Sequence, residues 1–105
     1  MVKASKKHKL HQHMVKTALQ AYERALVEGR GWLEFASFPL KVRLDAITMR
    51  AAKSESSKKQ KTQFLGFIAS MEADLKAVED AGDKELAARI RQTIVSYRKL
   101  NKQAL

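Results

Sequence analysis

The chain has 105 residues, 21 of them Lys or Arg and 11 Asp or Glu, so its formal net charge is +10. Hydrophobic residues make up 45%, which excludes a disordered basic tail and is normal for one small globular domain. Cysteine is absent, which excludes disulfides and thiolate metal sites. No apolar run approaches the ~20 residues of a membrane span, and no secretory signal is recognisable. We therefore expect a cytoplasmic protein without a membrane partner.

The composition favours helices along the whole chain. Ala, Lys, Leu, Glu and Gln are frequent, and the chain has one proline and four glycines. We predict a single all-α domain over residues 1–105, with antiparallel neighbouring helices arranged as a four-helix bundle or a helical-hairpin assembly. Residues 1–9 are either part of this domain or a flexible basic arm.

The first predicted helix spans residues 5–28 and ends before Gly29, because a glycine just past a periodic segment is the usual helix stop. Its expected buried stripe consists of Val15, Leu19, Tyr22 and Leu26.

Three of the seven aromatic residues lie in the segment 32–38. We interpret this segment as a helical turn whose rings pack in the core. The alternative is that the rings stack on nucleobases, as aromatic side chains on basic scaffolds do.

The second predicted helix begins at Ser37 and Pro39, since proline is tolerated in a first turn. It is apolar on two sides, whereas a surface helix is apolar on one. Either the helix is central in the monomer, or its second face binds another subunit. One stripe consists of Leu40, Leu44, Ile47 and Ala51, and the second of Val42, Ala46 and Met49.

The third predicted helix begins near Ser57, which has capping-box spacing to Gln60, and ends at Gly82. A single helix over residues 39–81 is the alternative. Lysines at the start and acids at the end oppose the helix dipole, which indicates pairing with another helix or subunit of reversed polarity. The expected buried stripe is Phe64, Phe67, Ile68, Met71, Leu75 and Val78.

The fourth predicted helix is capped by Asp83 and follows a short turn, which indicates an antiparallel hairpin with the third helix. Its expected buried face is Leu86, Ile90, Ile94 and Tyr97.

Basic charge gathers at the two ends of the chain. Residues 1–30 hold seven basic and two acidic residues, and residues 83–105 hold six and two. In the last helix, spacings of 7, 7 and 4 align four cations opposite the buried face; we call Lys84, Arg91, Arg98 and Lys102 the basic ridge. Such a ridge can follow phosphates, although a plain solvated face is the alternative. The predicted nucleic-acid-binding residues are Lys3, Lys6, Lys7, Lys9, Lys84, Arg91, Arg98, Lys99 and Lys102.

The three histidines, His8, His11 and His13, lie within six residues of one another. No acid precedes Glu23 to complete a metal site with them, so we expect a basic solvated arm or a packed edge. No nucleophile–base–orienter set or glycine-rich phosphate loop is present in the sequence. We therefore predict no enzymatic activity, no metal and no cofactor.

Two functional hypotheses follow. The first is a non-enzymatic protein that binds RNA or DNA through phosphate contacts from its first and last helices, with little base-specific readout. The second is a helical adaptor or assembly protein. It would bind an acidic protein partner, or itself as a homo-oligomer, through Val42, Ala46 and Met49.

Overall fold

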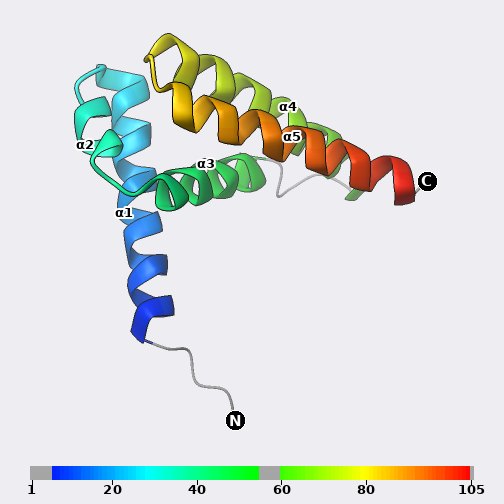
Figure 1. The fold of residues 1–105 in the computed structure, drawn as a ribbon, viewed down its shortest axis with the longest axis horizontal. Coiled ribbons are helices and arrows are strands. Elements are labelled where there is room, and N and C mark those ends of the chain that lie inside the picture. The colour runs from blue at the N-terminus through cyan, green and yellow to red at the C-terminus, as the bar shows by residue number, and fades with distance from the viewer. Residues whose placement is uncertain (1–5, 55–59, 105) are drawn as a thin grey trace. The chain divides into compact units, whose positions relative to one another are not determined.

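The structure is a computed structural model that describes residues 6–54 and 60–104. The prediction of an all-helical chain is confirmed for these residues, which form helices and no strand (Figure 1). The chain divides into two compact units, Met1–Ala46 and Ile47–Leu105, with the boundary inside α3. The helices are α1 (Lys6–Glu28), α2 (Trp32–Ala36), α3 (Leu40–Ser54), α4 (Gln60–Asp80) and α5 (Lys84–Ala104).

In the first unit, α2 folds back onto the C-terminal half of α1 (Figure 1). Gly29 ends α1 with φ +72°, and its amide donates to the carbonyl of Ala25 at 2.9 Å, the αL form of helix ending. Two residues later the chain approaches α1 closely. A Cβ placed on Gly31 would lie 2.7 Å from the Ala25 nitrogen and 2.9 Å from the Ala21 oxygen. Only glycine fits at this position without movement of the backbone.

The aromatic segment packs in the core of this unit, as predicted. Phe35 is fully buried, and its ring centroid lies 4.8 Å from that of Tyr22 and 5.3 Å from that of Trp32. The Tyr22 and Trp32 rings meet edge to face at 6.2 Å. Aromatic pairs at such separations add to the free energy gained by burial alone.

One member of the predicted α1 stripe is misplaced. Leu26 is 42% exposed, whereas Val15, Leu19 and Tyr22 are buried as expected. Since α2 covers α1 on the side of Ala21 and Ala25, the buried stripe turns toward these alanines, and Leu26 falls outside it.

The start of α3 differs from the prediction. The Ser37 hydroxyl does not cap α3; it donates backward to the carbonyl of Glu34 at 2.5 Å and closes α2. Pro39 directly precedes α3, and its carbonyl accepts from the amide of Arg43 at 3.0 Å. The side chain of Arg43 is buried, and its Nε donates to the carbonyl of Phe38 at 3.1 Å.

In the second unit, α4 and α5 lie side by side and are joined by a short turn (Figure 1). Gly82, with φ +83°, donates to the Glu79 carbonyl at 3.0 Å, and the Asp83 amide donates to the Val78 carbonyl at 3.3 Å. This pair of bonds is a Schellman ending. The Asp83 carboxylate then accepts from the amide of Leu86 at 3.1 Å, which confirms the predicted N-cap of α5.

The core of the second unit contains most of the predicted α4 and α5 stripes. Ile68, Met71 and Val78 of α4 are buried, and Phe67 and Tyr97 pack edge to face with centroids 5.2 Å apart. The buried residues of α5 are Leu86, Ala87, Ile90 and Ile94. The structure does not describe residues 55–59, which connect α3 to α4. The side chain of Phe64 in α4 also lies outside the described side chains.

One buried ion pair lies in this unit. The Asp74 carboxylate is 2% exposed, and its Oδ1 accepts from Nη1 of Arg50 at 2.5 Å. The pair links α4 to the C-terminal half of α3. A buried carboxylate is costly unless it is paired, so the contact with Arg50 favours this packing.

Among the described helices, none combines the length and the apolar character that a membrane crossing requires.

Candidate nucleic-acid interface

The basic ridge is exposed, but it does not lie opposite the buried face of α5 as predicted. Lys84, Arg91 and Arg98 are exposed, as is the neighbouring Lys99, and at 100° per residue the ridge borders the buried Ala87 and Ile94, on the side toward α4. Successive seven-residue steps place the first three ridge positions about 10.5 Å apart along the helix axis. Lys102 belongs to α5, but its side chain lies outside those described. The folded helix thus carries a row of cations with the predicted spacing.

Two ridge cations are paired with carboxylates of α4. Nη2 of Arg91 lies 2.6 Å from Oε2 of Glu79, and Nη2 of Arg98 lies 3.0 Å from Oε2 of Glu72. All four side chains remain about half exposed. Sequence reasoning missed both pairs, because it placed no acid on the ridge and did not consider the adjacent helix. The available signal was spacing, since Glu72 and Glu79 are seven residues apart, as are Arg91 and Arg98.

The other described cations of α5 have no carboxylate partner among the described side chains. Lys84 and Lys99 are exposed and in no ion pair there, and the same is true of Arg89. Near the start of α5 the surface is hollowed between the helices, and the hollow is lined by Glu79, Gly82, Lys84, Ala87 and Arg91. A phosphate oxygen at this hollow would meet one lysine, one arginine and the Glu79 carboxylate that is paired with that arginine.

The predicted N-terminal cluster lies partly in α1. Lys6, Lys7 and Lys9 belong to the helix, which begins at Lys6, while Lys3 lies outside the described residues. Lys9 is exposed, and the first turn of α1 contains no acid. Residues 1–46 hold nine basic and four acidic residues, and residues 47–105 hold twelve and seven, so each unit carries a net charge of +5.

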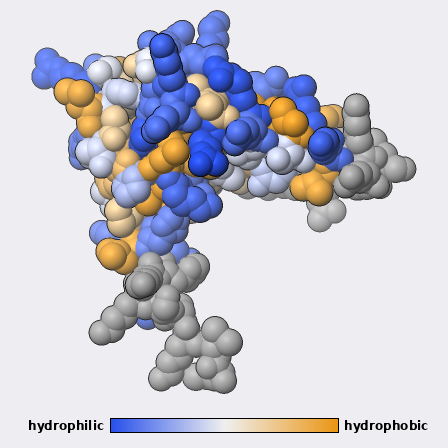
Figure 2. Space-filling model, viewed as in Figure 1, coloured by the Kyte–Doolittle hydropathy of each residue, from blue (hydrophilic) through white to orange (hydrophobic). Residues whose placement is uncertain are grey.

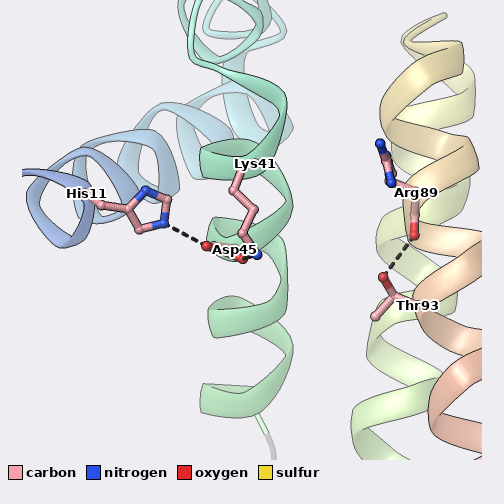
Figure 3. A network of polar contacts seen from close by, with 5 residues as sticks. All are labelled: His11, Lys41, Asp45, Arg89 and Thr93. Carbon is pink, nitrogen blue, oxygen red and sulfur yellow. Dashed lines mark hydrogen bonds and ion pairs between the residues drawn. The ribbon is translucent and has the colours of Figure 1, made fainter. Parts of the chain in front are cut away.

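One histidine has a partner that its local sequence does not reveal. Nε2 of His11 in α1 lies 2.7 Å from Oδ2 of Asp45 in α3, and Nζ of Lys41 lies 3.4 Å from the other oxygen of that carboxylate (Figure 3). His13 is exposed. Among the described residues, no three groups of His, Cys, Asp or Glu are placed to hold a metal ion. The contact fits the expectation of a packed edge for His11.

The predicted protein interface on α3 is largely covered within this one chain. Val42 is 3% exposed and Ala46 is fully buried, while Met49 is half-buried. The opposite stripe is buried at Ile47 and Ala51.

None of the described aromatic side chains is exposed. Tyr22 and Phe35 are buried, and the other four described aromatics are half-buried: Trp32, Phe38, Phe67 and Tyr97. The face visible in Figure 2 is mostly hydrophilic, with apolar residues in separate patches. Binding of splayed bases between exposed rings therefore has no support from the described residues.

No protein-family model, curated protein or solved structure matches this chain.

Proposed function

We propose that this protein is a non-enzymatic nucleic-acid-binding protein that contacts the phosphate backbone of a duplex through the basic ridge of α5. The observation that carries the proposal is the row of exposed cations on one rigid helix, Lys84, Arg91 and Arg98, flanked by Lys99. Each Lys or Arg that neutralises a phosphate releases condensed counterions, and the forked guanidinium groups match phosphate oxygens.

The absence of exposed rings among the described aromatics favours a duplex over a single strand. Proteins that bind single strands without sequence preference combine a basic groove with aromatic side chains on which bases stack. A duplex offers phosphates at the surface and needs no stacking partner. RNA and DNA duplexes are both compatible with a row of cations.

The proposal is tested by gel-shift titrations with duplex RNA, duplex DNA and single-stranded DNA at two salt concentrations. We expect retardation of a duplex at low salt and its loss at high salt. If the four ridge cations and Lys99 all engage phosphates, the logarithm of affinity for duplex DNA should fall with the logarithm of salt with a slope of about −4.5. No retardation of either duplex at low salt would refute the proposal, whether or not single-stranded DNA is retarded.

The assembly hypothesis stays a prediction, including the antiparallel four-helix bundle and a homo-oligomer. The burial of Val42 makes Val42→Glu a test of folding rather than of association. Met49→Glu is the better probe, because Met49 is the half-buried member of that face. Sedimentation of wild type and Met49→Glu at several concentrations would measure self-association. A monomeric wild type would refute the homo-oligomer.

A further inference from the structure

We propose that Glu72 and Glu79 are intramolecular competitors of phosphate, which occupy Arg98 and Arg91 until a polyanion displaces them. This inference concerns the regulation of the proposed site and rests on the proposed function. It starts from the two contacts across the α4–α5 pair, Arg91 to Glu79 at 2.6 Å and Arg98 to Glu72 at 3.0 Å.

A carboxylate and a phosphate present similar acceptors to an arginine. Both offer oxygens to the N–H groups of the planar guanidinium, often to two at once. While the Glu79 carboxylate lies against Arg91, part of that donor fork is taken, and a phosphate reaching Arg91 must replace or share this partner. The same holds for Glu72 and Arg98.

The exposure of these pairs makes the exchange feasible. The Arg91 and Glu79 side chains are 53% and 45% exposed, and those of Arg98 and Glu72 are 57% and 50% exposed. Ion pairs that are half open to water contribute little to stability, so they can be broken at small cost. The Arg50–Asp74 pair in the same unit is different, because its carboxylate is 2% exposed and out of reach of a ligand.

The position of the acids on α4 supports a role toward α5. Glu79 lies in the last turn of α4, where a negative charge is unfavourable with respect to the helix dipole. Helix α4 gains nothing by itself from an acid there. The contact with Arg91 offsets this unfavourable interaction of Glu79 with the helix dipole. Glu72 and Glu79 are seven residues apart, as are Arg91 and Arg98, so the same kind of contact forms twice between α4 and α5.

The test compares two double variants that add the same charge. Glu72→Gln with Glu79→Gln removes both competitors while keeping the side-chain shape. Asp80→Asn with Glu85→Gln also removes two exposed acids from α4 and α5, but neither is in an ion pair among the described side chains. Affinities of wild type and both variants for one duplex are measured by fluorescence anisotropy at fixed salt, with circular dichroism to verify folding.

We expect the Glu72/Glu79 variant to bind about three- to tenfold more tightly than the Asp80/Glu85 variant, since each exposed pair opposes binding by the small energy of its contact. Equal affinities of the two variants would show that net charge alone governs binding and would overturn the inference while leaving the proposed function intact. If wild type and both variants bind no duplex, the proposed function and the inference both fail. If only the Glu72/Glu79 variant binds, the competition is complete in the wild type, and the proposed function then fails for the unmodified chain.

Discussion

At the residue scale, the second unit depends on one asymmetric ion pair. The carboxylate of Asp74 is 2% exposed, whereas the side chain of Arg50 is 37% exposed. Water can therefore solvate the guanidinium if the carboxylate is removed, but it cannot solvate the carboxylate if the guanidinium is removed. The pair is a requirement for packing rather than a large net source of stability.

We accordingly expect Arg50→Met to lower the free energy of unfolding by about 3–5 kcal/mol, because it leaves a buried carboxylate without its guanidinium partner. Arg24→Met is the matched control, since the Arg24–Glu34 pair is half exposed and its loss should cost about 0–1 kcal/mol. Urea unfolding followed by circular dichroism measures both. Equal costs for the two substitutions would contradict the role given to Asp74.

Gly31 provides a second test at this scale. Its φ is −65°, which alanine adopts readily, so by backbone conformation alone Gly31→Ala would be neutral or stabilising. The new Cβ would instead meet the α1 backbone at 2.7 Å and 2.9 Å, and we expect a loss of about 1–3 kcal/mol in unfolding free energy. Gly29→Ala is the contrasting variant, with open space but a strained φ of +72°. A thermal melt of Gly31→Ala that matches wild type would show that α2 does not approach α1 this closely.

At the element scale, local stop and start signals predicted the α4–α5 turn well and the start of α3 poorly. Gly82 and Asp83 act on their own backbone and that of adjacent turns, so their roles are visible in a short stretch of sequence. The Ser37 hydroxyl, by contrast, can form a hydrogen bond either with the end of α2 or with the start of α3. Its hydroxyl serves the end of α2, which the sequence pattern did not separate from the start of α3.

The cap at Asp83 gives the prediction for this scale. Asp83→Ala removes the side-chain acceptor of the Leu86 amide and should lower the free energy of unfolding by about 1 kcal/mol. Asp83→Asn keeps an oxygen acceptor and should retain most of the stability. Urea unfolding of wild type and of the two variants measures these differences in the free energy of unfolding. If the asparagine variant loses as much as the alanine variant, the hydrogen bond to Leu86 is not what stabilises the turn.

At the scale of the whole molecule, the sequence predicted helices, buried stripes and the placement of cations on one side of α5, because these follow from periodicity within single elements. It did not predict which charges meet. His11, Arg50 and Arg98 lie 34, 24 and 26 residues from their partners Asp45, Asp74 and Glu72, and such pairings depend on tertiary packing. The spacing of the basic ridge along α5 was therefore visible in the sequence, but its partial neutralisation by α4 was not foreseen.

The most direct test of the account is the salt dependence of duplex DNA binding by wild type, by Arg91→Gln with Arg98→Gln, and by Arg24→Gln with Arg30→Gln. The last variant removes the same charge from residues 1–46. We predict that loss of Arg91 and Arg98 makes the log–log slope shallower by about 1.8, since each phosphate contact contributes about 0.9. The Arg24/Arg30 variant should keep the wild-type slope. Identical slopes for all three proteins would contradict the assignment of the phosphate contacts to the basic ridge of α5.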